Sequence, residues 1–155
     1  HARIVVQNAL FAPTATTTNL IIPHCTYTNP EVSSVGKTSQ ELQAEKISYD
    51  VYRVELGDLD RSQTEGDKKG FVEVLTDKGG DKILGATILA RDAGEQITPI
   101  CIAMVNNLGL REIGKATIPY PTRGEYVRRL ADTYNRTRIT PSVNHFIKTW
   151  LRLTS

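Results

Sequence analysis

The sequence predicts an α+β fold, an antiparallel sheet of three to five strands with helices packed on one side. Strand-like segments come first and are joined by short connections, and the longer helical segments are collected after them rather than alternating with them. Gly79-Gly80 between two such strands predicts a hairpin, because glycine supplies the positive φ of a tight reversal. From Ala93 onward, apolar residues recur at helical spacing. At 155 residues the chain can close one core.

The first segments are a short helix and an edge strand. Residues 1–11 have a helical pattern that Pro13 terminates. The mostly apolar stretch Leu20–Tyr27 suits a strand, and Pro23 places it at a sheet edge or a bulge.

A capping box and an alternating strand follow. Thr38-Ser39-Gln40-Glu41 begins a short helix that ends near Lys46, since the threonine hydroxyl and the glutamate can each bond the other's backbone amide. Ile47–Leu56 has apolar residues on both faces, which favours a well-covered strand. Gly57–Lys69 is polar and charged, so we expect an exposed excursion. Strands at 70–76 and 82–90 then flank the hairpin turn.

Three helices are expected after the hairpin. Asp92 and Glu95 have capping-box spacing and predict a long helix that ends at Gly109. Pro99 should kink this helix or mark a first turn that is not α-helical. A second, short helix is expected at 110–115, and Thr122-Arg123-Gly124-Glu125 begins a third. The apolar side of that third helix holds Val127, Leu130, Ala131 and Tyr134.

Thr140-Pro141 predicts one more helix start, leading into an amphipathic tail that carries Trp150.

Three segments in a fixed order resemble a known family. They are Tyr27-Thr28-Asn29-Pro30-Glu31-Val32, then Ile83-Leu84-Gly85-Ala86 with Ala93-Gly94-Glu95, then Ile118-Pro119-Tyr120-Pro121-Thr122-Arg123-Gly124-Glu125. Over residues 20–136 the chain is similar to the carboxy-terminal dimerisation domain of the pyridine nucleotide–disulfide oxidoreductases. That family has an x-Pro-Thr-x-x-Glu segment whose x is usually His. Here it is Tyr120, as in the mercuric reductase branch.

The resemblance implies a division of the chain. Residues 1–19 would be the remnant of the last helix of a preceding FAD domain and its linker. Residues 20–138 would be the dimerisation domain, the interface domain of a flavoprotein reductase, and residues 139–155 a carboxy-terminal amphipathic helix. The chain opens on His1 rather than Met, so we expect a piece of a longer protein.

The resemblance also implies an active-site role in trans. In the family this segment reaches across a two-fold interface to the flavin and redox disulfide of the partner subunit. Tyr120 would then contact the partner's thiols, or alternatively pack as an interfacial aromatic residue. Glu125 would orient an imidazole in the disulfide reductases. With no imidazole here, its spacing favours a helix cap. Pro121 would lie near the partner's flavin through its backbone, and with Pro119 it would hold the arm extended.

Cofactor motifs are missing from the sequence. No GxGxxG turn is present, so we expect FAD and NAD(P)H to be bound by other domains of the parent and none by this chain. Cys25 and Cys101 form no metal-ligand spacing, and no metal site is expected. The mercuric reductases end in a vicinal cysteine pair, whereas here no Cys follows Cys101. Mercury reduction by that relay is therefore not expected of the parent.

Basic residues gather near the carboxyl end. Residues 123–152 hold seven basic and two acidic groups. This charge could rest on an anionic membrane surface, dock on an acidic face of the FAD domain, or be solvated. Neither a membrane span nor a signal peptide is expected. A cytoplasmic location is favoured over a membrane-peripheral one.

Two classes of function compete. The leading one is the interface domain of a homodimeric flavoprotein oxidoreductase, dimerising and docking on the FAD and NAD(P)H domains of its own chain. The alternative is a stand-alone α+β interaction module without redox function. Nucleic acid is not an expected partner, because no aromatic platform or recognition helix accompanies the basic residues.

Overall fold

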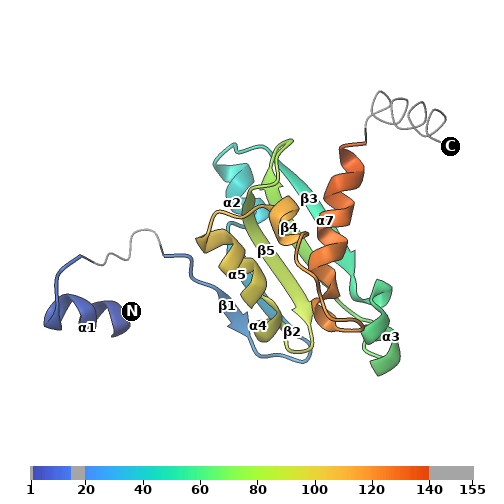
Figure 1. The fold of residues 1–155 in the computed structure, drawn as a ribbon, viewed down its shortest axis with the longest axis horizontal. Coiled ribbons are helices and arrows are strands. Elements are labelled where there is room, and N and C mark those ends of the chain that lie inside the picture. The colour runs from blue at the N-terminus through green and yellow to red at the C-terminus, as the bar shows by residue number, and fades with distance from the viewer. Residues whose placement is uncertain (1, 15–19, 140–155) are drawn as a thin grey trace.

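A computed structural model describes residues 2–14 and 20–139, which fold into a five-stranded antiparallel sheet with helices (Figure 1). The strand order is β1-β2-β5-β4-β3. The strands are β1 (His24–Thr26), β2 (Glu31–Gly36), β3 (Tyr49–Glu55), β4 (Phe71–Asp77) and β5 (Ile83–Ala90). The helices are α1 (Ala2–Leu10), α2 (Ser39–Ala44), α3 (Asp60–Glu65), α4 (Ala93–Gln96), α5 (Thr98–Val105), α6 (Leu110–Ile113) and α7 (Tyr126–Thr137), with short 3-10 turns η1 (Leu56–Asp58) and η2 (Arg123–Glu125). The predicted α+β class is confirmed.

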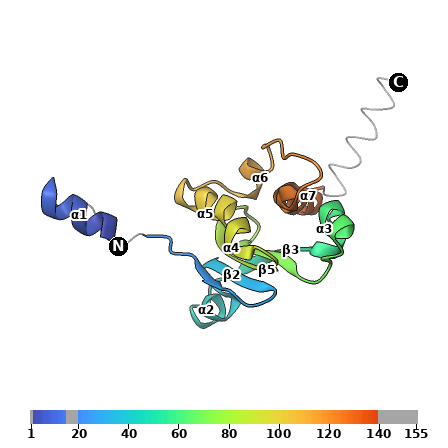
Figure 2. The same ribbon diagram turned by 90° about the horizontal axis from the view of Figure 1, so that it is seen from below.

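The core lies between one face of the sheet and helices α4 to α7. Figure 2 shows these four helices on that face and α2 on the opposite side. Strand register aligns Val35 with Ala86, Ala86 with Val74, and Val74 with Tyr52, so one buried row crosses four strands. The ring of Tyr52 meets that of Tyr134 on α7 edge to face, with centroids 5.7 Å apart. Burial of these apolar surfaces is the main force that holds the layers together.

Several local predictions are confirmed. The capping box of α2 is complete, since the Thr38 hydroxyl accepts from the Glu41 amide and the Glu41 carboxylate accepts from the Thr38 amide. The hairpin between β4 and β5 is present, with Gly79 at φ 73°. The predicted apolar side of α7 is buried, together with Tyr126. Strand β1 is an edge strand, as Pro23 predicts.

Two elements were not predicted. Strand β2 begins at Glu31, within the first of the three family segments, and it pairs with β1 and β5. Within the excursion after β3, α3 forms and the chain buries Leu59 and Ser62 completely, so the excursion is not wholly exposed. The sequence concealed both elements because neither has a long periodic run of apolar residues.

The strand β3 was predicted to be covered on both faces, and this is wrong for the described chain. Tyr52 and Val54 are buried against the helices, but Val51 is 51% exposed on the other face.

Two predicted capping boxes are also wrong. Asp92 adopts a left-handed conformation, φ 56°, and makes no side-chain cap bond. Thr122 makes none either, because its hydroxyl donates to the Pro119 carbonyl at 2.7 Å. The helix expected after Asp92 divides into α4 and α5 at Ile97, two residues before Pro99, because a proline interrupts the hydrogen-bond ladder of a helix. The helix predicted from Thr140 lies outside the described residues.

Candidate functional site

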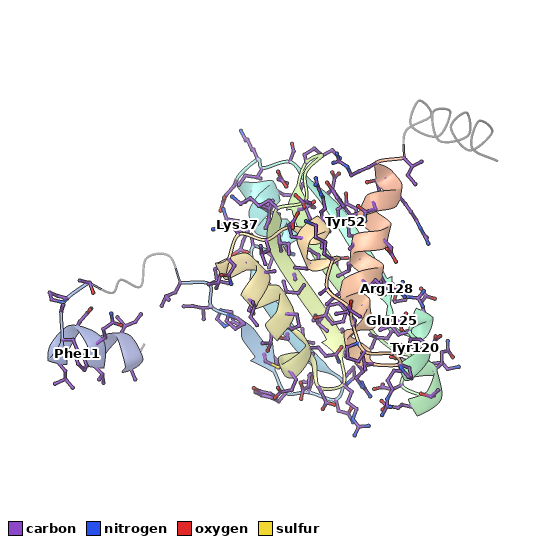
Figure 3. All side chains as sticks on the ribbon, viewed as in Figure 1. Phe11, Lys37, Tyr52, Tyr120, Glu125 and Arg128 are labelled. Atoms are coloured by element: carbon purple, nitrogen blue, oxygen red, sulfur yellow. The ribbon has the colours of Figure 1, made fainter. Side chains whose placement is uncertain are left out.

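The proline-bracketed segment that carries Tyr120 lies on the surface between α3 and α7 (Figure 3). Ile118 anchors it against the core, whereas Tyr120 is 69% exposed. The hydroxyl of Tyr120 donates to Oδ2 of Asp60 at 2.5 Å. That hydrogen bond, with the negative charge of Asp60, raises the pKa of the phenol. Tyr120 is therefore protonated at neutral pH, and its hydroxyl donates a hydrogen bond to a carboxylate of its own chain.

Arg123 fixes the same segment from the other side. Its guanidinium contacts Asp67 at 2.9 Å and also pairs with Glu65, and its side chain is only 17% exposed. These contacts join η2 to the carboxyl end of α3. Hydrogen bonds from Arg61, and then from Arg123, lower the pKa of Glu65. Sequence reasoning missed Asp60, Glu65 and Asp67 because they precede the Tyr-bearing segment by more than fifty residues and lie in a stretch with no distinctive motif.

Glu125 is a buried ion-pair partner rather than a helix cap. It is 3% exposed, and its Oε1 accepts from Arg129 Nε at 2.9 Å and from Arg128 Nη2 at 3.2 Å. Its second oxygen, Oε2, has no hydrogen-bond partner among the described residues. The favoured cap function is thus wrong, and Glu125 instead orders the first turn of α7 through two arginines.

Pro121 is exposed beside Tyr120, and nothing in the described chain covers it. The structure therefore brings Tyr120 and Pro121 to the surface and keeps Glu125 below it.

The other two family segments have structural explanations. The Glu31 carboxylate accepts from the Gly94 amide at 3.0 Å, which ties the start of β2 to α4. At Gly85, a Cβ would come within 2.0 Å of the Lys37 carbonyl oxygen, so only glycine fits where β5 passes the end of β2. These residues hold the sheet and the helices in place.

The two cysteines are free. Burial and the neighbouring Glu31 carboxylate raise the pKa of Cys25, and burial raises that of Cys101. Both are therefore thiols at neutral pH and poor nucleophiles. Within residues 2–14 and 20–139, no group of His, Cys, Asp and Glu could hold a metal ion.

The basic residues form a groove beside α7. It has a volume of about 450 Å³, and it is lined by Arg53, Val54, Asp58, Arg128, Arg129, Asp132, Thr133 and Arg136. Arg128 and Arg129 are paired with carboxylates of their own helix or its first turn. Much of the positive charge is thus compensated inside the chain. No helix in the described part of the chain is long and apolar enough to cross a bilayer.

The chain matches a family model and several known proteins. Residues 22–131 match the family model of the pyridine nucleotide-disulphide oxidoreductase dimerisation domain. The mitochondrial dihydrolipoyl dehydrogenase of Dictyostelium discoideum is 39% identical over 116 residues, which are 74% of this chain and 24% of that protein. The mercuric reductase of Streptomyces lividans is 29% identical over 134 residues, or 86% of this chain and 28% of that protein. The chain thus spans about a quarter of the length of these relatives.

Solved structures share the fold. The Cu(II) complex of the HOCl-induced flavoprotein disulfide reductase RclA from Escherichia coli has a TM-score of 0.77 and 21% identity, covering 84% of this chain and 30% of that chain. LpdA from Mycobacterium tuberculosis has a TM-score of 0.76 and 22% identity, covering 84% of this chain and 28% of that one.

Proposed function

The chain belongs to the dimerisation-domain family of the pyridine nucleotide-disulphide oxidoreductases, and we propose that it forms the two-fold interface of a homodimeric flavoprotein reductase. In this proposal the segment around Tyr120 reaches the active site of the partner subunit. The observation that carries it is the family match together with the placement of Tyr120, whose ring is exposed between two prolines on a segment anchored at both ends. An exposed, fixed aromatic side chain is what an arm that inserts into a partner requires.

FAD and NAD(P)H would be held by other parts of the parent. Fold neighbours include a flavoprotein disulfide reductase, which supports a flavin in the parent. The described residues offer no phosphate cradle of their own. Gly79 lies in a hairpin turn, Gly85 is pressed against the Lys37 carbonyl, and Gly94 donates its amide to Glu31. Pro121 would lie near the partner's flavin through its backbone. When bound, FAD supplies the electron transfer between NAD(P)H and the thiols.

The tyrosine in place of the family's histidine supports a mercuric-reductase-like parent, and the similarity to the Streptomyces lividans enzyme agrees with it. Dihydrolipoyl dehydrogenases are also among the relatives, which supports a dihydrolipoyl-dehydrogenase-like parent as the second candidate. A phenol cannot replace an imidazole as a base near neutral pH, because its pKa is about 10 and here is raised further. Tyr120 would instead form a hydrogen bond with a partner sulfur. The internal pairing of Arg123, Arg128 and Arg129 favours a solvated helix face over a membrane-binding one.

Replacing Tyr120 by Phe in the full-length parent tests this function. We expect the half-reaction of the partner's thiols to slow by roughly three- to tenfold, the effect of losing one hydrogen bond to a partner sulfur. Flavin reduction by NAD(P)H should be unchanged, and the ring that remains should keep the dimer intact. Stopped-flow absorbance separates the two half-reactions.

Tyr27→Phe is the matched control, because Tyr27 is 81% exposed and lies on a different segment. Equal rates for Tyr120→Phe and the parent in both half-reactions would leave Tyr120 as a packing residue.

A further inference from the structure

We propose that Asp60 is a positioning residue for Tyr120. Its carboxylate, at the start of α3, holds the phenol so that the Tyr120 hydroxyl meets the partner subunit as a hydrogen-bond acceptor. The inference rests on the proposed function, because it concerns how Tyr120 is presented to the partner's sulfur atoms. It assigns to α3, an element that carries no family motif, a part in the active site across the interface.

The hydrogen bond to Asp60 determines whether the Tyr120 hydroxyl can donate to a second partner or accept from it. A tyrosine hydroxyl has one proton to donate and two lone pairs to accept with. Tyr120 donates its proton to Oδ2 of Asp60 at 2.5 Å, across 60 positions of sequence. The lone pairs are the part of the hydroxyl left for a second partner. A protonated thiol can donate to them, whereas a thiolate would find no proton to accept while the Asp60 bond persists.

The position of Asp60 is built into the fold rather than incidental. Its helix is anchored by Leu59 and Ser62, which are completely buried. The far end of the helix is held by Arg123, which pairs with Glu65 and with Asp67 at 2.9 Å. The Tyr-bearing segment is thus joined to α3 at both ends of that helix. A surface helix fixed in this way can hold a carboxylate in a constant place under the phenol.

The carboxylate that contacts Tyr120 comes from α3 and not from the residue five positions further along the same segment, Glu125. Here Glu125 is occupied by Arg128 and Arg129, and the carboxylate that contacts Tyr120 is Asp60. The two charged groups that otherwise act on the phenol are Glu125, which raises its pKa, and Arg129, which lowers it. Asp60 is the strongest influence of the three.

The first test uses the 155-residue chain and needs no catalysis. The phenolate absorbance of the chain, minus that of Tyr120→Phe, isolates Tyr120 from the other five tyrosines. We expect Asp60→Asn to lower the pKa of Tyr120 toward the ordinary value of about 10. Asp58→Asn, which removes an exposed carboxylate from the preceding turn, should leave it unchanged. An identical Tyr120 titration in Asp60→Asn and the parent chain would overturn the proposal.

The second test uses the full-length dimer. Asp60→Ala should slow the thiol half-reaction by roughly three- to tenfold, as expected for one lost hydrogen bond, and leave flavin reduction unchanged. Asp60→Glu, which restores the carboxylate, should recover part of the rate.

The outcomes separate the two proposals. If Tyr120→Phe is slow and Asp60→Ala matches the parent enzyme in rate, Asp60 does not position Tyr120 and the proposed contact of Tyr120 with the partner's sulfur stands. If Tyr120→Phe itself matches the parent enzyme, that contact fails and Tyr120 is a packing residue of the interface. In that case the titration of the chain still decides whether Asp60 controls the phenol.

Discussion

At the scale of single residues, buried charge in this chain is arranged to hold one surface segment. Glu125 is a carboxylate with almost no exposure, and one of its oxygens, Oε1, is paired with two arginines whose own side chains reach solvent. It stands at the start of α7, where the helix dipole also favours a negative charge. Its loss would therefore disturb the junction between the Tyr-bearing segment and α7.

Replacing Glu125 by Ala should destabilise the chain by about 1.5–3 kcal/mol, because two charged hydrogen bonds to a buried acceptor are lost. Urea unfolding followed by circular dichroism measures the change. Asp132→Ala is the matched control: it removes an exposed partner of Arg128, and exposed pairs contribute within about 1 kcal/mol. Equal effects of the two substitutions would mean that the burial of Glu125 contributes nothing.

At the scale of elements, the sheet depends on close passages that only small residues permit. The Gly85 Cα lies where β5 passes Lys37, directly after β2 ends. On the helical side, the hydroxyl of the buried Tyr126 donates to the Gln96 carbonyl and links α7 to α4. Gly85 thus allows the close packing within the sheet, and Tyr126 links two helices of the helical layer, through separate contacts.

Replacing Gly85 by Ala should cost about 3 kcal/mol or more, since the added methyl group would overlap a backbone oxygen that cannot rotate away. The midpoint of thermal unfolding measures it. Gly57→Ala is the control, because a Cβ at that position meets only ordinary contact at 3.7 Å. A Gly85→Ala chain as stable as the control would contradict the close approach of Gly85 to the Lys37 carbonyl.

At the scale of the whole molecule, the chain leaves apolar surface uncovered. Helix α5 is apolar around its whole circumference: Ile100 and Ala103 are buried against the sheet, while Ile102 and Val105 are more than half exposed. A helix that is apolar on all sides is normally covered on all sides. On α1, Val5 and Val6 are also exposed. These surfaces accord with a domain that functions against other protein surfaces.

We expect the chain to form dimers or larger assemblies at tens of micromolar concentration, measured by sedimentation equilibrium. The double substitution Ile102→Asp and Val105→Asp should weaken association, because it places charges on the exposed side of α5. Val51→Asp, on the open face of the sheet, is the control and should leave association intact. A clean monomer for the unmodified chain would remove the expectation.

Stability should also fall in acid. The pKa of Glu65 is lowered by its bonds to Arg61 and Arg123, and that of Asp50 by Lys78 and the Gly79 amide. A carboxyl group with a lower pKa in the folded state stabilises that state above its unfolded pKa, and the contribution is lost as pH falls through the folded value. Thermal midpoints should therefore hold steady above about pH 5 and decrease below it.

High salt should flatten this decrease, since these pairs are at the surface. Asp50→Asn should flatten it in part. A midpoint that is constant down to pH 3 would contradict the assignment.

The sequence by itself determined the elements whose signals are local. These are the Thr38–Glu41 capping box, the glycine-bearing hairpin and the apolar side of α7. Each depends on neighbours a few residues apart, so each can be predicted from the sequence alone. The order of the strand-like and helical segments likewise predicted the α+β class. The short strand β2 and helix α3 could not be predicted from the sequence, because each is stabilised by partners distant in sequence rather than by its own periodicity.

Only the tertiary structure decided the chemistry around Tyr120. Glu125 has the spacing of a cap, yet folding buries it, and two arginines on the first turn of α7 become its partners. Asp60 has no local signal at all, and it reaches Tyr120 only because Arg123 and the buried Leu59 fix α3 beside the segment. Contacts between residues more than fifty positions apart are set by how layers pack, and a spacing rule within one helix turn cannot contain them.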